Sequence, residues 1–411
     1  MLSTKRTKTT SSFPSPIDTI ANNDDLLKEI LLRLPIKSLL KFKTVSKHWL
    51  SLISNPHFSR FYRPHSNSPC ALFLRSSNRP LNPEYGFYTL QTSTNSNAPF
   101  KTLTFTVDSG GIEIIQSCNG LLLCATFRTR YRSKRNYYVY NPTTRHYTTL
   151  PHPLPGRISG VSLAFDPSKS PHYKAVCVTN SRSLRNHLQI QIYSSETGPW
   201  RTSAVPFTTT GNIEFDCGVF CNGAIHWISD SGRCLYFEVD RELLKEMPMP
   251  PIPDGWDQRR VRYFGESRGS LFLVEIYKPP HDHQLEVYEL ASDYSGWFPK
   301  YQVDINAVAA AFPEMGRDYL QDPSILNYYA FQILCVVKGE TEDGSYLVLH
   351  IPNKLIRYEF KAKRFQKLHD FVLSEKMLHD IPPNGRLLAQ ESAKHFALCS
   401  TYEYIESLAS V

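Results

Sequence analysis

Hydrophobic residues near the start of the chain recur with the spacing of an α-helix. One broad apolar face is formed by Leu26, Leu27, Ile30, Leu31 and Leu34. The polar run Asn22-Asn23-Asp24-Asp25 precedes this face and supplies the side-chain oxygens and negative charge that favour a helix N-terminus. Pro35 follows it, and its fixed φ ends one helix while suiting the first turn of another. The pattern therefore predicts an amphipathic helix that stops at Pro35.

Two further helical segments follow Pro35. One shared face consists of Leu39, Phe42, Ser46 and Trp49, with Leu40 and Val45 beside it. Leu50, Leu52 and Ile53 continue the pattern until Asn55-Pro56 stops it. We predict a three-helix module over residues 17–64, after a flexible leader at residues 1–16 that has no hydrophobic period. A core of this size is difficult to stabilise alone, so we expect part of its apolar surface to meet a partner.

After Pro69 the helical period disappears, and short strands separated by turns take its place. A strand that carries an aromatic residue recurs as Gly86–Leu90, Tyr137–Tyr140, Gln189–Tyr193, Cys234–Val239, Leu285–Tyr288 and Leu355–Tyr358. Successive copies lie roughly 44–53 residues apart, apart from a longer last interval, and this is the spacing of propeller blades. The chain is thus predicted to be an α+β multidomain protein whose residues 65–411 form an all-β propeller of about six blades.

Repeated turns and the end of the chain support a closed ring. Ser117–Leu122 resembles Phe220–Ile225 around a shared Asn-Gly pair, and Arg268–Phe272 is a weaker third copy. Asn-Gly favours a hairpin turn because both residues tolerate positive φ. The strand Ala397–Tyr402 is expected to return to the first blade and remove its open edge. A two-sheet sandwich and an incompletely closed propeller are the alternatives.

The longer last interval indicates an insertion at residues 301–328. Long irregular segments often carry function, which makes this insertion a candidate for target binding. Its apolar run Ala307–Phe312 is either a docking patch or a packed helix, and packing is favoured.

Charge argues against a nucleic-acid-binding protein. The net charge is +8, from 46 basic and 38 acidic residues, which is a mild bias over 411 residues. The densest basic cluster contains Arg128, Arg130, Arg132, Lys134 and Arg135, with Tyr131 among them. Such a cluster could contact RNA or an acidic partner, but a solvated hairpin is the favoured interpretation. We therefore expect no nucleic acid among the partners.

The cysteines and the absence of long apolar runs favour the cytosol or the nucleus. The nine cysteines are scattered with no Cys-x-x-Cys pair, and many lie in apolar runs, such as Cys124 and Cys335. They resemble buried free thiols of a reducing compartment. No run approaches the roughly 18 apolar residues that a membrane helix needs, so no membrane association is expected.

No catalytic motif is evident in the sequence, which contains no P-loop, G-x-S-x-G or H-E-x-x-H pattern. His281 and His283 could ligate a metal, but a lone His pair in a polar turn is more often solvated. Cys217, Cys221 and His226 could form a reactive site, although alternating burial along a strand explains them equally well. We expect neither a cofactor nor a metal, and no enzymatic activity.

The order of residue identities in the N-terminal module resembles the F-box. Residues 24–35 are similar to its first helix, and residues 36–49 to its second helix, ending in the Val-Ser-Lys-x-Trp turn at Val45–Trp49. Residues 52–58 match its usual ending. Residues 70–405 resemble the kelch-like F-box-associated domain of plant families. That similarity rests on the Ser-Cys-Asn-Gly-Leu-Leu and Tyr-Asn-Pro-Thr-Thr segments and fades after about Pro251.

The resemblance implies a substrate adaptor of a Skp-cullin-F-box ubiquitin ligase. Members dock on a Skp-type adaptor, which joins them to cullin and RING subunits, while the downstream domain holds a protein substrate for ubiquitin transfer. The implied docking residues are Leu26, Leu27, Ile30, Leu31, Leu34, Pro35, Leu39, Val45 and Trp49. Many F-boxes have Leu-Pro where this chain has Asn22-Asn23, which implies less apolar contact with the adaptor at that end.

A carbohydrate- or small-ligand-binding propeller without a ligase role is the main alternative. It would use aromatic side chains such as Trp256 and Trp297 at the mouth of a pocket, and both lie in turns rich in Pro or Gly. Trp297 could equally be buried against its blade. A propeller enzyme is a third possibility, disfavoured because no catalytic cluster is present. Neither alternative requires the N-terminal module.

Overall fold

A computed structural model describes the greater part of the chain. The described residues are 23–55, 58, 61–62, 68–75, 83–91, 97–106, 111–127, 135–181, 184, 187–209, 213–229, 233–256, 259–277, 285–316, 329–370 and 401–411. Several predicted features lie outside these ranges, namely the leader at 1–16, the basic residues of the cluster other than Arg135, the pair His281 and His283, and residues 317–328.

The N-terminal module consists of helices α2 (Asp24–Leu31), α3 (Ile36–Phe42) and α4 (Lys47–Ser54), as predicted. The Asn23 side chain accepts hydrogen bonds from the backbone N–H groups of Asp25 and Leu26, and the Ser46 hydroxyl accepts one from Trp49. Pro35 stands at the N-cap of α3. Helix α2 ends three residues earlier than its apolar pattern suggested, since residues 32–34 form a turn.

The remainder is a propeller of six antiparallel sheets. Blade 1 contains β1 (Ala71–Arg75), β2 (Tyr85–Thr89) and β23 (Thr401–Tyr404). Blade 2 contains β3 (Ile112–Cys118), β4 (Leu121–Thr126), β5 (Tyr137–Asn141) and β6 (His146–Thr149). Blade 3 contains β7 (Ile158–Ala164), β8 (Lys174–Asn180), β9 (Leu188–Ser194) and β10 (Arg201–Phe207).

The second half of the propeller continues in the same order. After the short η1 helix (Phe215–Cys217), blade 4 contains β11 (Val219–Cys221), β12 (Ala224–Trp227), β13 (Cys234–Glu238) and β14 (Leu243–Met247). Blade 5 contains β15 (Val261–Ser267), β16 (Ser270–Glu275), β17 (Leu285–Leu290) and β18 (Trp297–Val303). Blade 6 contains β19 (Gln332–Val337), β20 (Tyr346–Ile351), β21 (Lys354–Glu359) and β22 (Arg364–Asp370). The short η3 helix (Glu342–Gly344) lies between β19 and β20.

The repeated aromatic strands mark one equivalent position in every blade. In blades 2 to 6 they correspond to β5, β9, β13, β17 and β21, each the third strand of its sheet. In blade 1 the copy is β2, which is third when β23 is counted as the first strand. The prediction of six blades is therefore confirmed. It succeeded because the third strand of each blade carries aromatic and other large apolar side chains at a nearly fixed interval along the chain.

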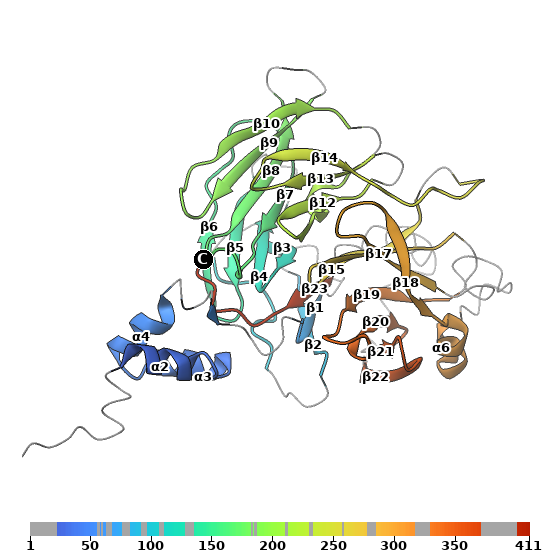
Figure 1. Ribbon diagram of the computed structural model, residues 1–411, viewed down its shortest axis with the longest axis horizontal. Coiled ribbons are helices and arrows are strands. Elements are labelled where there is room, and N and C mark those ends of the chain that lie inside the picture. Colours follow the sequence, from blue (N-terminus) through green and yellow to red (C-terminus); the bar gives the residue numbers. More distant parts are fainter. Residues whose placement is uncertain are drawn as a thin grey trace, which may run out of the picture.

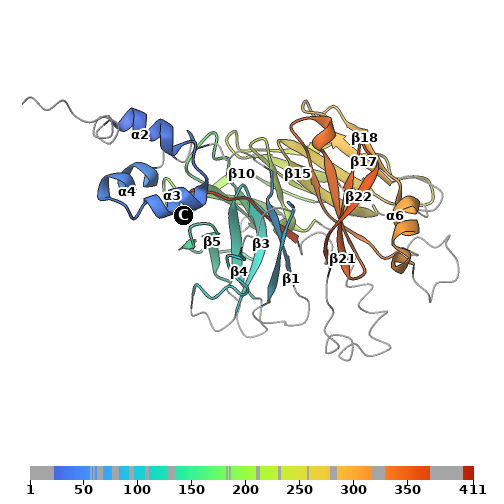
Figure 2. The same cartoon turned by 90° about the horizontal axis from the view of Figure 1, so that it is seen from below.

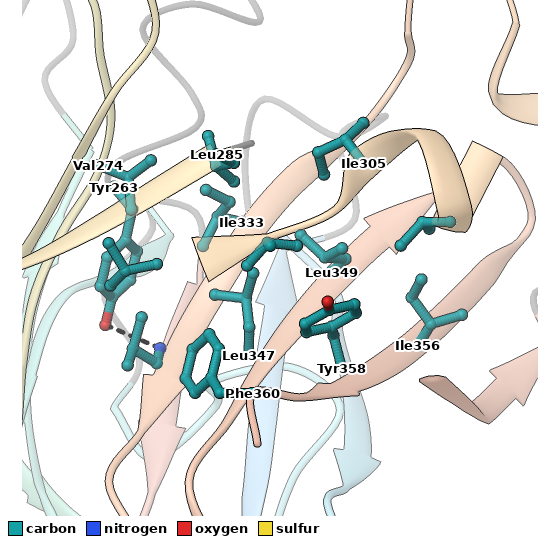
Figure 3. Close-up of a cluster of buried hydrophobic side chains, with 14 of the residues drawn as sticks. Tyr263, Val274, Leu285, Ile305, Ile333, Leu347, Leu349, Ile356, Tyr358 and Phe360 are labelled. Carbon is teal, nitrogen blue, oxygen red and sulfur yellow. Dashed lines mark hydrogen bonds between the residues drawn. The ribbon is translucent and has the colours of Figure 1, made fainter. Parts of the chain in front are cut away.

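Apolar clusters fill each interface between neighbouring blades. Figure 3 shows the cluster between blades 5 and 6, where Tyr263 and Val274 meet Leu347 and Phe360. The Tyr263 hydroxyl accepts a hydrogen bond from the backbone N–H of Val336, 3.2 Å away. A further cluster joins blade 6 to blade 1 through residues such as Val348 and Leu72. The contact between the last and the first blade completes a ring, so the two-sheet sandwich is excluded.

The C-terminal strand closes the ring, as predicted, although its position differs. Strand β23 pairs antiparallel with β1, with Phe73 opposite Tyr402. The prediction placed this strand at Ala397–Tyr402, whereas it spans Thr401–Tyr404, and residues 397–400 lie outside the described residues. Pairing β23 with β1 removes an edge that would otherwise be open to other chains.

The start of the predicted insertion is ordered. Residues 301–303 complete β18, and helix α6 (Ile305–Ala311) and the short η2 helix (Pro313–Met315) follow. Ile305 and Val308 are buried in the cluster between blades 5 and 6, where Ile305 is visible in Figure 3. The apolar run is thus a packed helix, the interpretation that the sequence favoured over a docking patch.

The two faces of the propeller differ. The turn face carries the hairpin turns between the first and second strands, including Asn119-Gly120 and Asn222-Gly223, all four of which have positive φ. The opposite loop face carries the connections between blades and between second and third strands. Strand β23 ends on the turn face, and the chain runs from there to the helical module, where Figures 1 and 2 place the C-terminus.

Candidate docking surface

The nine predicted docking residues fall into three groups. Leu27, Leu31 and Leu39 are fully buried in the core of the helical module itself. Leu34 and Trp49 are half-buried, whereas Leu26, Ile30, Pro35 and Val45 are exposed. The predicted surface therefore mixes core residues with surface residues, and a partner can contact the exposed group without rearranging the core.

Leu26 and Ile30 provide the centre of the exposed group. They lie one turn apart on α2, and their side chains are 46% and 44% exposed. Val45, in the turn before α4, is 60% exposed. Residues at i and i+4 share a helix face, so α2 presents one leucine–isoleucine row outward and another, Leu27 and Leu31, inward. An apolar row of this kind fits the groove or helix face of a partner.

Local interactions fix the residues that flank this row. The Trp49 ring packs edge-to-face on Phe42, with 5.1 Å between the ring centroids. His48 and Asp24 lie 3.0 Å apart, and Arg33 and Glu29 are paired on the surface of α2. Exposed pairs such as these contribute at most about 1 kcal/mol each, so the apolar row dominates the binding energy that this surface can supply.

Leu50 and Phe61 are exposed apolar residues that the predicted docking set omitted. They are 45% and 56% exposed, and the Lys28 ammonium lies over the Phe61 ring at 4.8 Å. The sequence did not separate Leu50 from the core residues. Leu50 and Ile53 are three residues apart and so share a face on a helical projection of α4, although only Ile53 is buried.

Asn23 has a defined role at the position where F-boxes commonly carry proline. Its side chain caps α2, as described above, while Asn22 lies outside the described residues. The departure from Leu-Pro thus exchanges an apolar contact for an N-cap, which typically stabilises a helix by about 1 kcal/mol.

The structure divides the predicted aromatic ligand-binding pair. Trp297 packs in the cluster between blades 4 and 5, and its indole N–H donates to the Pro248 carbonyl at 2.8 Å. It is a structural residue. Trp256 is half-buried against Tyr277, with Arg260 over its ring at 5.0 Å. Of these two tryptophans, Trp256 alone is placed to stack on a small ligand.

Arg135 is not part of a solvated basic surface. Its side chain is 8% exposed, and the guanidinium donates to the Thr126 carbonyl at 2.6 Å and pairs with the carboxylates of Glu113 and Asp216. Glu113 also pairs with Arg75. Burial raises the pKa of Glu113, while the two arginines act in the opposite direction. The favoured interpretation of a solvated hairpin is therefore wrong for Arg135, since its side chain is buried between the carboxylates of Glu113 and Asp216.

Cys217, Cys221 and His226 do not form a reactive site. His226 lies opposite Val219 in the sheet, and Cys221 lies opposite Ala224. The side chains of His226 and Cys221 are therefore not a cross-strand pair. Burial raises the pKa of the Cys221 thiol, which disfavours the nucleophilic thiolate. Among the cysteines in the described part of the chain, seven are free thiols, as predicted, and six of these are buried. Cys217 is an exception, because it is disulfide-bonded.

His226 is a buried contact between blades 4 and 5. It is 0% exposed and stacks with Tyr236 and Tyr294. Its Nδ1 lies 3.1 Å from the Val219 carbonyl and its Nε2 lies 2.6 Å from the Tyr294 hydroxyl. Burial lowers the pKa of His226 to about 4, so the ring is neutral at pH 7.

The stability of the propeller should therefore fall in mild acid through His226. Its folded-state pKa is depressed below the ordinary 6.5, so its contribution is fully present above pH 6.5 and is lost as the pH falls towards 4. Between pH 8 and pH 5 we expect a loss on the order of 2 kcal/mol from this group. Urea unfolding at both values should show a smaller loss in His226→Gln, whereas exposed His146→Gln should follow the wild type. Equal pH dependence in all three proteins would contradict the assignment.

Within the described part of the chain, His, Cys, Asp and Glu side chains do not gather in any group of three or more that could hold a metal ion. Nor do the described helices include one that is long and apolar enough to span a membrane.

Known proteins match both parts of the chain. The family model described as F-box domain matches residues 23–61, and that described as F-box associated beta propeller domain matches residues 87–275. "F-box protein At5g07610" of Arabidopsis thaliana is 40% identical over 99% of this chain and 96% of its own length. "F-box protein At5g49610" of the same plant is 29% identical over 62% of this chain and 71% of its own length.

A solved structure with a related shape is the β-propeller domain of the Trilobed protease from Pyrococcus furiosus. It is 11% identical over 73% of this chain and 78% of that chain, with a TM-score of 0.36. This likeness is too weak to add to the strand pairing described above.

Proposed function

Because the chain belongs to the family of F-box proteins that carry an F-box-associated β-propeller, we propose that it is a substrate receptor of a Skp-cullin-F-box ubiquitin ligase. The F-box docks on a Skp-type adaptor, and through it on the cullin and RING subunits. The propeller holds a target protein. The observation that carries the proposal is the exposed apolar row of the F-box, centred on Leu26 and Ile30.

The contribution of this chain to ubiquitin transfer is proximity. Holding two reactants together converts a reaction between separate molecules into one within a single complex, and this can supply a large part of a rate enhancement. The chemistry then belongs to the other subunits, and the receptor itself has no catalytic role.

We assign target binding to the loop face of the propeller. The turn face is partly occupied by the chain between β23 and the F-box, whereas the loop face carries the longer connections. Binding residues are commonly placed on loops that a rigid scaffold positions. The half-buried group of Trp256, Tyr277 and Arg260 lies at this face and is a candidate contact.

The wild-type chain should form a stable equimolar complex with a purified Skp-type adaptor. Size-exclusion chromatography would show co-elution, and calorimetry would give the stoichiometry and affinity. Addition of the cullin and RING subunits should then shift the whole complex to a larger size. Separate elution of receptor and adaptor at micromolar concentrations would contradict the proposed function.

A further inference from the structure

The last seven residues connect the two domains. This C-terminal tail (Ile405–Val411) leaves β23 on the turn face and ends near the F-box helices, as Figure 1 shows. Leu408 and Ala409 in the tail are buried, and Ser410 is exposed. Leu408 belongs to the core cluster of the F-box, whereas Ala409 belongs to the cluster between blades 2 and 3. Neighbouring residues of the tail therefore enter the cores of different domains.

On the propeller side, every hydrogen-bonding site of the Asn141 side chain is used, and its amide nitrogen holds the tail. Its amide nitrogen donates to the carbonyls of Ser407 and Ala409 at 3.0 and 2.8 Å. Its amide oxygen accepts from the backbone N–H groups of Thr143 and Thr144. Asn141 is fully buried, so leaving any of these groups unpaired would be costly. The Tyr-Asn-Pro-Thr-Thr segment, whose role the sequence left open, thus binds the tail.

Two more contacts on the propeller fix the same segment. The Thr143 hydroxyl accepts a hydrogen bond from the Ser407 N–H at 3.1 Å. Gly120, with φ of +88°, lies so close to the tail that a Cβ atom there would stand 2.5 Å from the Cβ of Ser407. A side chain at this position would displace the tail, so glycine is favoured at position 120 both by its positive φ and by the close approach of the tail.

On the F-box side, Leu408 completes the hydrophobic core. The cluster contains Leu27, Leu31, Ile36, Leu39, Ile53, Phe58 and Tyr62 from the F-box, and Leu408 is the one member from outside it among the described residues. Leu408 is 7% exposed. The Glu406 carboxylate lies 3.9 Å from the Lys37 ammonium. Burial, with a smaller contribution from the Glu406 charge, raises the pKa of Tyr62 to about 12.

We infer that the C-terminal tail fixes the orientation of the F-box on the propeller and that Leu408 is its positioning residue. A small helical module gains stability from each additional buried side chain, and here one comes from the opposite end of the chain. The same eleven residues, 401–411, also supply β23, so ring closure and placement of the F-box depend on one segment. A chain that lacks this segment would have neither.

The functional consequence rests on the proposed role as a substrate receptor. If target and ubiquitin-carrying subunits are held by different domains, the distance between them depends on how rigidly those domains are joined. A tail that enters both cores removes the freedom that a linker alone would leave, since linked domains otherwise move relative to one another. The positioning role itself, however, is a property of the free chain and can be measured without any partner.

The test compares full-length chains carrying spin labels at Glu29 on α2 and Leu243 on β14, attached through non-natural amino acids because the cysteines are numerous. Pulsed electron resonance should give a single narrow distance distribution for the wild type. Leu408→Asp and the milder Leu408→Ala should broaden it, while Ser410→Asp, an exposed change in the same tail, should leave it narrow. A narrow wild-type distribution in both Leu408 variants would overturn the inference.

Hydrogen exchange separates loss of orientation from loss of folding. Amides of α2 to α4 should exchange faster in Leu408→Ala, and amides of the propeller core should keep their wild-type protection. Global loss of protection in both Leu408 variants would overturn the assignment of Leu408 to positioning. Adaptor binding is measured on the wild type in parallel. Failure to bind would contradict the proposed function and leave the distance measurement to decide the role of the tail.

Discussion

Replacing Leu26 and Ile30 together with aspartate should weaken binding to a Skp-type adaptor by at least about 100-fold, which corresponds to about 2.7 kcal/mol. Full burial of a large aliphatic side chain contributes roughly 1.5–3 kcal/mol, and each of these side chains is already about half buried. The lost apolar contact of the pair therefore accounts for roughly 1.5–3 kcal/mol. Desolvating two carboxylates without partners adds a further cost of several kcal/mol.

The matched control is Leu243→Asp. Leu243 is 48% exposed, close to the values for Leu26 and Ile30, but it lies on β14 at the outer edge of blade 4. Calorimetric titration with the adaptor should give the wild-type affinity for this variant. Unfolding curves should show that all three proteins remain folded, because no fully buried side chain is altered. If the double variant binds as tightly as the wild type, the adaptor does not use the exposed row of α2.

The helical module shows what sequence periodicity can and cannot resolve. Leu26 and Ile30 form one row at i and i+4, and Leu27 and Leu31 form another, so both rows looked equally suited to docking. The structure assigns the second row to the core. Which of the two rows is buried depends on where α3, α4 and Leu408 pack. These contacts do not change the hydrophobic pattern of α2, so the pattern could not reveal them.

The propeller was predictable wherever its repeat imposed a local requirement. The third strands recur because each blade buries the same position, and Asn-Gly recurs because the hairpin turns need positive φ. The role of Asn141 was hidden, since its two carbonyl partners lie 266 and 268 residues away in the tail. Likewise, the pattern around Arg135 resembled a solvated hairpin, because its carboxylate partners Glu113 on β3 and Asp216 on η1 are not adjacent to it in the sequence.

Replacing Arg135 should be strongly destabilising, because its side chain is buried between two carboxylates. Removing one member of a buried ion pair typically costs 3–5 kcal/mol, because the remaining charge stays buried. For Arg135→Met we expect about 3 kcal/mol, at the lower end, since Arg75 still pairs with Glu113. Urea unfolding at pH 7 measures this change. The control is Arg33→Met, which breaks the pair with Glu29 at a site where both side chains are more than half exposed, and should cost less than about 1 kcal/mol.

The loss of unfolding free energy caused by Arg135→Met should also depend on pH. The direction of this pH dependence identifies Glu113 as the cause. Burial already raises the pKa of Glu113, and loss of the Arg135 charge should raise it further. A carboxyl group whose pKa is raised in the folded state contributes stability below its unfolded-state pKa of about 4.3, and this contribution is lost as the pH rises. The difference between Arg135→Met and the wild type should therefore shrink as the pH is lowered from 7 to 4.5. A difference that stays constant over this range would mean that lost packing on Tyr137, and not the unpaired carboxylate, sets the cost.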